Sequence, residues 1–185
     1  MLEVKGYKGF SQNMENEPGD KFEVGKIYTT DNEDDLLFGM NGNGFHFCKY
    51  LSDCFVYFRP ETSIYAEVTG LEEVRETDDE YNDIYGICVA RKIRIDRILT
   101  PDEIIERYIN PSKGIWTMAL KRFIQMYHPL TDEQISMLEK TYMKDAFILK
   151  DIMYYQRNIK DTYSDSKKIL EYQKKLIKKY ESSSE

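Results

Sequence analysis

The sequence has little cysteine and no long apolar run. Only Cys48, Cys54 and Cys88 occur among 185 residues, too few and too unevenly spaced for a disulfide framework. No stretch approaches the roughly 20 apolar residues that a membrane span needs, and no signal-peptide pattern is present. A chain of this length can bury a core large enough to fold without disulfides. We therefore expect a reducing, cytoplasmic setting with no membrane partner.

Basic residues are scarce in the first part of the chain. Residues 1–100 hold 11 Lys/Arg against 20 Asp/Glu, whereas residues 101–185 hold 15 against 13. Nucleic-acid-binding surfaces are basic, so DNA or RNA is not an expected partner of the first part. A basic end does occur, and we interpret it as a solvated helix face in preference to an arm for nucleic acid or an acidic partner. Its lysines are Lys167, Lys168, Lys174, Lys175, Lys178 and Lys179.

Residues 44–58 join three features that predict a site. The Asn-Gly-Asn-Gly run at 41–44 is typical of a turn that needs positive φ. Residues 45–48 alternate as a short, half-buried strand. Leu51, Cys54, Phe55 and Phe58 then recur along one face of a helix. A strand that runs into an amphipathic helix is where we expect a pocket.

Residues 1–99 have the pattern of a β-rich unit with about six strands. We predict strands at 2–10, 22–28, 36–38, 45–48 and 63–69, and one long run over 84–99. The glycines at 6 and 9 are expected to let another backbone or a ligand approach closely. The acidic stretch 72–83 is expected to be an exposed loop.

From Thr100 the pattern becomes helical. Thr100-Pro-Asp-Glu and Thr131-Asp-Glu-Gln each match a capping box, so helices should begin there. Further helices are predicted at 115–127 and 165–180, and residues 135–155 form either one long helix or two. The fold class is therefore α+β, with a β-rich unit at 1–99, a helical bundle or extension at 100–181, and a frayed tail at 182–185.

Familiar catalytic patterns are absent. No two cysteines have the spacing of a structural zinc site, so no metal is expected. Cysteine and histidine are both present, but the sequence marks no third residue that would orient the histidine for nucleophilic catalysis. The acidic runs at 31–35 and 76–83 are typical of solvated loops, and the glycines at 39–44 lack the lysine of a phosphate-binding loop.

The first resemblance is carried by six pieces in order. They are Lys-Gly-Phe at 8–10, Phe-Glu-Val-Gly-Lys-Ile-Tyr at 22–28, Gly-Phe-His-Phe-Cys at 44–48, Asp-Cys-Phe-Val-Tyr at 53–57, Tyr-Ala-Glu-Val at 65–68 and Ala-Arg-Lys-Ile at 90–93. Residues 5–99 in this way resemble an uncharacterised domain found in proteins of bacteriophages and large DNA viruses. The resemblance implies a viral origin and no activity.

A more distant resemblance is to the ADP-ribosyltransferase fold of poly-ADP-ribose polymerases. Gly44-Phe-His-Phe-Cys48 followed by Cys54 and Tyr57 has the spacing of a motif in that fold, and Lys8-Gly9 falls where those enzymes carry His-Gly or Arg-Gly. The resemblance implies that Tyr57 stacks on a nicotinamide-like ring, with His46 in place of a tyrosine and Cys54 in place of a serine. Lys8 would contact a ribose or a phosphate. The implied ligand-binding residues are Lys8, Gly9, Gly44, His46, Cys54 and Tyr57.

The catalytic acid of those transferases has no counterpart in the matching strand, because residues 84–93 contain no Asp or Glu. Unless Asp83 or Glu67 substitutes, several kcal/mol of transition-state stabilisation would be missing. Aromatics at this spacing also fill ordinary β-rich cores. The first hypothesis is therefore a viral or phage accessory protein that binds a host or viral protein, without cofactor and on a degenerate transferase-like scaffold. The alternative is an active ADP-ribosyltransferase or NAD-consuming enzyme with His46 and Asp83 as catalytic candidates.

Overall fold

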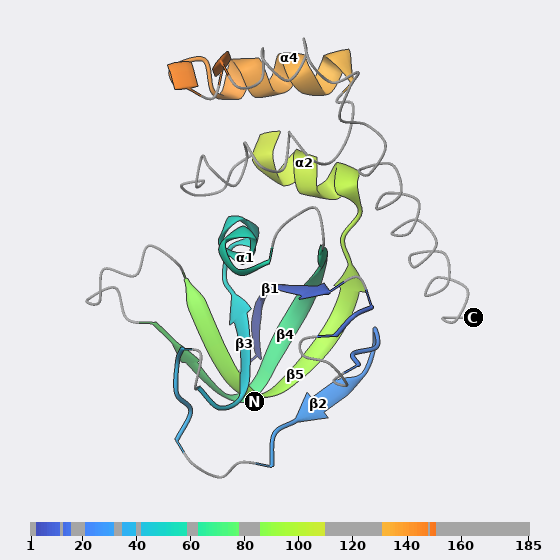
Figure 1. The fold of residues 1–185 in the computed structure, drawn as a ribbon, viewed down its shortest axis with the longest axis vertical. Helices are drawn as coiled ribbons and strands as arrows, with labels where there is room; N and C mark the ends of the chain where they lie inside the picture. The colour runs from blue at the N-terminus through green and yellow to red at the C-terminus, as the bar shows by residue number, and fades with distance from the viewer. Residues whose placement is uncertain are drawn as a thin grey trace. The chain divides into compact units, whose positions relative to one another are not determined.

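A computed structural model describes residues 3–11, 13–15, 21–31, 35–39, 42–58, 63–77, 86–109, 131–147 and 149–150. The protein is α+β (Figure 1). Its chain forms two compact units, one of residues 1–59 and 63–99 and one of residues 60–62 and 100–185. We call the first the β unit and the second the helical unit, and describe each by itself. The predicted helices at 115–127 and 165–180 and the tail at 182–185 lie outside the described residues.

The β unit is a five-stranded antiparallel sheet among its described residues. Its strands are β1 (Glu3–Ser11), β2 (Ile27–Thr29), β3 (Phe45–Cys48), β4 (Ser63–Glu76) and β5 (Ile87–Ile98), in the order β2-β5-β3-β1-β4. Because β4 also pairs with β5, the sheet closes on itself. Closure leaves no free edge on β4. The strands therefore surround a common interior (Figure 1).

Strand β4 is longer than the sequence pattern predicts. We expected it to end near Gly70 and residues 72–83 to form a loop, yet β4 continues through Glu76. Glu72 has a φ of 65°, and the pairing with β5 shifts register between Leu71 and Val74, so a bulge bends the strand there. Within the bulge, the Glu72 side chain pairs with Lys92 and the Glu73 side chain with Arg91 across the two strands. These ion pairs explain why an acidic segment can form a strand.

Glycines make room for an aromatic ring in the interior. A Cβ added to Gly6 would lie 2.6 Å from Cδ2 of Phe47, and one added to Gly70 would lie 2.7 Å from Cζ of the same ring. Phe47 itself is 2% exposed. Gly6 had been expected to let another backbone or a ligand approach closely, and another backbone does so: the Cys48 carbonyl oxygen would lie 2.5 Å from a Cβ at Gly6.

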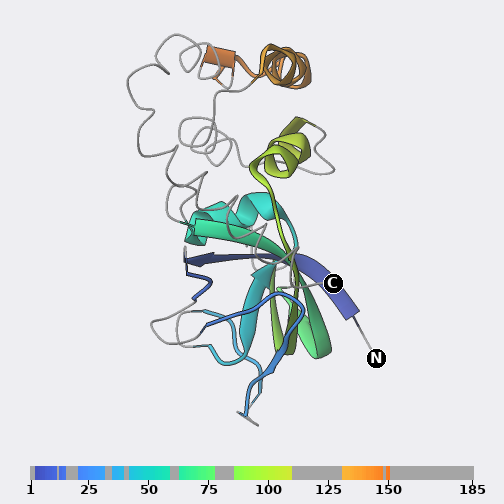
Figure 2. The ribbon, with the colours of Figure 1, turned by 90° about the vertical axis from the view of Figure 1, so that its right-hand side faces the viewer.

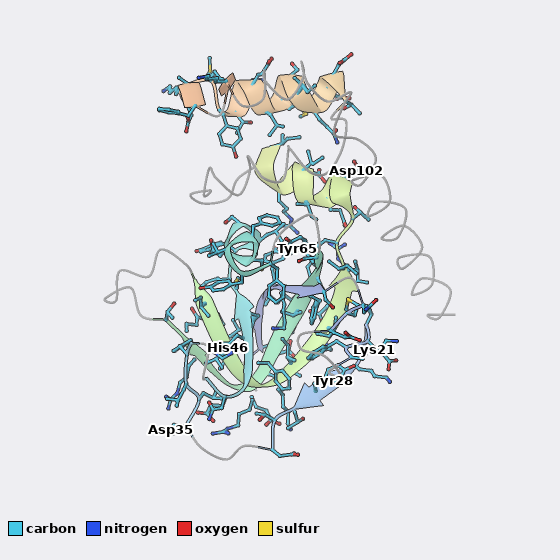
Figure 3. All side chains as sticks on the ribbon, in the orientation of Figure 1. Lys21, Tyr28, Asp35, His46, Tyr65 and Asp102 are labelled. Carbon is cyan, nitrogen blue, oxygen red and sulfur yellow. The ribbon has the colours of Figure 1, made fainter. Side chains whose placement is uncertain are left out.

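Helix α1 (Leu51–Tyr57) follows β3 after two residues, as the sequence predicts. Leu51, Cys54 and Phe55 are buried. The helix lies beside β1 in both views (Figures 1 and 2). The ring of Phe55 packs edge-on against Tyr65 of β4, at 4.6 Å between ring centroids. Figure 3 labels Tyr65 beside α1.

Two other predicted strands are wrong in extent or kind. The strand expected at 22–28 is reduced to β2, because the chain turns at Gly25, which has a φ of 82°. Residues 36–38 form no strand. In this segment a side chain takes the place of a strand partner: the Leu37 amide donates a hydrogen bond to Oδ1 of Asn43 at 2.8 Å. Leu36 is nevertheless buried.

The described part of the helical unit contains α2 (Pro101–Ile109) and α4 (Asp132–Thr141). Both predicted capping boxes are present: Glu103 N donates to Oγ1 of Thr100 at 3.2 Å, and Gln134 N donates to Oγ1 of Thr131 at 3.1 Å. Helix α4 ends at Thr141 and the chain turns at Tyr142, so residues 135–155 do not form one continuous helix.

Two side-chain contacts join α2 and α4. Oγ1 of Thr141 donates to the Ile109 carbonyl at 2.9 Å, and Nε2 of Gln134 donates to Asp102 at 3.4 Å. Asp102 is labelled in Figure 3. Within the described ranges, no helix is both long and apolar enough to cross a membrane.

Candidate functional site

A cavity of about 380 Å³ opens between β1, β3 and α1 of the β unit. Its wall includes all six residues that the sequence singled out: Lys8, Gly9, Gly44, His46, Cys54 and Tyr57. Aromatic rings of Phe45, Phe47 and Phe58 complete much of the surface. The residues come from separate parts of the sequence, and the sheet brings them together by pairing Tyr7 of β1 with Cys48 of β3.

Lys8 is the buried cation of this site. Its side chain is on β1, and the residue is 5% exposed. Nζ donates a hydrogen bond to the carbonyl of His46 at 2.8 Å and lies 5.6 Å from the centroid of the Phe10 ring. Burial lowers the pKa of Lys8 from 10.5 to about 8, although the nearby thiols of Cys54 and Cys48 oppose the shift. The site thus holds a strongly desolvated amine.

His46 faces Lys8 from β3. Burial lowers the pKa of its imidazole, and the neighbouring Lys8 lowers it further. Nε2 lies 3.1 Å from the Leu37 carbonyl, and the ring packs edge-on against Phe38 at 6.4 Å. Hydrogen bonds to the backbone at Leu37 and Gly44 partly oppose the shift of this pKa. The Leu37 carbonyl can accept from the ring only where Nε2 carries a proton. Figure 3 shows His46 on β3.

Cys54 and Cys48 form the sulfur-lined part of the wall. Both are free thiols and both are buried. Burial raises the pKa of Cys54 well above its usual value, and a hydrogen bond with Cys48 raises it further. Cys54 therefore stays a protonated thiol, which is neither a strong hydrogen-bond partner nor a ready nucleophile.

Tyr57 lies at the exposed end of the cavity wall. The sequence leaves open whether Tyr57 stacks on a ligand or fills a core, and in the structure the residue is 52% exposed. A ring in this position can stack on a ligand and still contact water. By contrast, the expected space at Gly9 is closed, because a Cβ there would lie 2.5 Å from Cγ of Phe58.

Carboxylates are missing from the described wall of the cavity. Glu67 accepts two hydrogen bonds from Arg97, each 2.9 Å long, and is not among the lining residues. Asp53 is buried at the start of α1, where it accepts from the Gly86 amide at 3.2 Å. Asp83, the other candidate acid, lies outside the described residues. Nor does the described part of the chain gather three residues that could hold a metal ion.

Sequence reasoning missed several lining residues. Tyr7, Gly39 and Ile87 belong to the wall but had no place in the predicted site. Phe58 was assigned to the helix face only. Its backbone carbonyl accepts a hydrogen bond from the Tyr65 hydroxyl at 2.6 Å, which holds the end of α1 against β4. No sequence signal marks the contact of Phe58 with Gly9, because the two residues come together only in the fold.

A second cavity, of about 310 Å³, adjoins the first. Lys21, Phe22, Tyr28 and Thr30 contribute to its wall, and Gly44 and Phe45 are shared by both cavities. Phe22 packs on Tyr28 at 4.7 Å between ring centroids. Figure 3 labels Lys21 and Tyr28 beside β2.

Comparison with known proteins gives a family and no activity. No curated protein and no solved structure matches the chain. One family model matches residues 4–107, which cover β1 to β5 and most of α2. That span includes every described residue of the cavity wall. The chain therefore belongs to the family described as a domain of unknown function (DUF7666).

Proposed function

We propose that the chain is a binding module and not an enzyme. In this proposal it is an accessory protein of viral or phage origin that acts on a host or viral protein. The cavity of the β unit is its recognition site for a flat aromatic group that carries a carbonyl. The resemblance of residues 5–99 to a phage and large-DNA-virus domain supports the origin. The single observation that carries the binding role is the cavity itself, with its aromatic wall and buried amine.

The chemistry of the wall selects this class of ligand. Tyr57, Phe45 and Phe58 offer apolar surface to a flat ring. The Lys8 ammonium has three N–H donors, and among described acceptors only the His46 carbonyl takes one of them. A ligand carbonyl near Nζ would accept another. Nicotinamide combines the ring and the carbonyl, so it is the appropriate first probe.

The absence of a carboxylate from the described wall favours binding over transfer. An ADP-ribosyltransferase stabilises a developing ribosyl cation with negative charge. Glu67 is neutralised by Arg97 and does not line the cavity. We accordingly propose a transferase-like scaffold that has lost its reaction. The alternative, an active NAD-consuming enzyme, then depends on Asp83.

The test is calorimetric titration with nicotinamide and with NAD, followed by NMR of the NAD sample for released nicotinamide. Saturable binding without release supports the proposal. Tyr57→Ala should weaken binding, whereas Phe147→Ala, which removes a ring that is 85% exposed in the helical unit, should not. Release of nicotinamide that Asp83→Asn abolishes would establish the enzyme instead. No binding of either compound at millimolar concentration would overturn the proposed site.

A further inference from the structure

The amine of Lys8 has surroundings unlike those of a surface lysine. It projects from β1 towards α1 and β3, and the charged or titratable groups that face it are Cys54 from α1 and Cys48 and His46 from β3. None of these three groups is a carboxylate. In the described part of the chain no carboxylate pairs with Lys8, although other lysines such as Lys26 and Lys49 are paired.

Desolvation without a counter-ion favours the neutral amine. With a pKa of about 8, roughly a tenth of Lys8 is unprotonated at pH 7, against roughly 0.03% for a lysine at 10.5. A neutral amine is a nucleophile, and a lysine desolvated in an apolar pocket is one that proteins use to form Schiff bases. Lys8 has in addition a cavity of about 380 Å³ in front of it, large enough for a small carbonyl compound.

We propose that Lys8 forms a reversible imine with an aromatic aldehyde or ketone that enters the cavity of the β unit. The Nζ lone pair attacks the carbonyl carbon and forms the C–N bond. The carbonyl oxygen then leaves as water, taking the two protons of the neutral amine, and a C=N bond remains. At pH 7 most of Lys8 is the ammonium, which first releases one proton to the solvent, so the whole conversion removes the buried charge and this favours the imine. This inference rests on the proposed function, because the ring is placed by the same aromatic wall.

The probe is pyridine-3-carboxaldehyde, which has the ring of nicotinamide and a reactive carbonyl. The intact protein is incubated with it at pH 7, and sodium borohydride then reduces any imine to a stable secondary amine. Peptide mapping by mass spectrometry locates the adduct. Mapping is needed because an amino terminus has a pKa close to that of Lys8. We expect Lys8 to be modified at least about tenfold more than Lys5, an exposed lysine on the same strand.

Two controls make the result specific. Lys8→Arg keeps a cation at this position and cannot form an imine, so the adduct in that peptide should disappear. Excess nicotinamide, whose amide does not condense with amines, should protect Lys8. Modification of Lys5 or the amino terminus with Lys8 untouched would overturn the inference. If nicotinamide still bound in that case, the proposed function would stand. Modification of Lys8 without nicotinamide binding would uphold the imine and refute the proposed recognition of an aromatic amide.

Discussion

Replacing Lys8 with methionine should change how the stability of the protein depends on pH. Lys8 has a pKa of about 8 in the fold, compared with 10.5 for an ordinary lysine. The folded protein therefore binds fewer protons at this site than the unfolded chain between these two pH values, and stability rises with pH across that window. Below pH 8 the burial cost is fully present.

The magnitude follows from the shift. A difference of about 2.5 pKa units corresponds to about 3 kcal/mol of destabilisation at pH 7, which is relieved as the pH rises towards 10.5. Methionine removes this cost. It also leaves the His46 carbonyl without the Lys8 donor, at a penalty of about 1–3 kcal/mol. The net change at pH 7 is therefore small, and the change in pH dependence is the better measure.

The assay is urea denaturation of wild type and Lys8→Met at pH 7, 8, 9 and 10. The wild type should gain stability relative to the variant by roughly 1.4 kcal/mol per pH unit above pH 8. Lys5→Met, on the exposed face of the same strand, is the matched control. Its stability should change with pH as that of the wild type does. A stability difference between wild type and Lys8→Met that stays constant with pH would refute the reasoning, because it would mean that Lys8 keeps its charge at no cost.

Three further predictions concern packing and capping. Gly70→Ala should lower the free energy of unfolding by roughly 1–3 kcal/mol, since its Cβ would meet the Phe47 ring at 2.7 Å. In a Phe47→Leu background, denaturation should show a smaller loss of stability for Gly70→Ala. Equal losses in the two backgrounds would contradict the steric explanation. Tyr57→Ala should lower stability by less than about 1 kcal/mol, because the ring is half exposed; a drop in melting temperature like that of a core truncation would place the ring in the core after all. Thr131→Ala should lower the free energy of unfolding by about 1 kcal/mol through loss of its capping hydrogen bond, while Thr131→Asp should retain the cap. Equal urea midpoints for the wild type and the alanine variant would show that the cap contributes nothing to stability.

The family assignment and the geometry answer different questions. Residues 4–107 define a family whose printed description gives no function. The cavity supplies a chemical hypothesis that the family does not. Its aromatic wall suits a ligand with a flat ring, and the Lys8 amine suits a ligand carbonyl. Binding of nicotinamide and trapping of an imine at Lys8 test separate parts of that hypothesis.

The sequence by itself determined the features that depend on neighbours a few residues away. The capping boxes at Thr100 and Thr131 are hydrogen bonds between residues three apart, and both formed as predicted. The strand at 45–48 and the helix that follows it were also predictable, since their periodicity is local. Four of the six residues proposed for the site lie within 44–58, which is why sequence reasoning placed them near one another.

Only the tertiary structure decided what distant segments do to one another. Residues 72–76 form a strand because Lys92 and Arg91 lie opposite their carboxylates, although the segment alone has the composition of a loop. Gly9 is closed by Phe58, and Lys8 is desolvated beside a carbonyl 38 residues away. Burial and close packing depend on which surfaces the sheet brings together when it closes, and no local pattern records them. The perturbed amine, on which the chemistry of the site depends, is therefore a product of the fold.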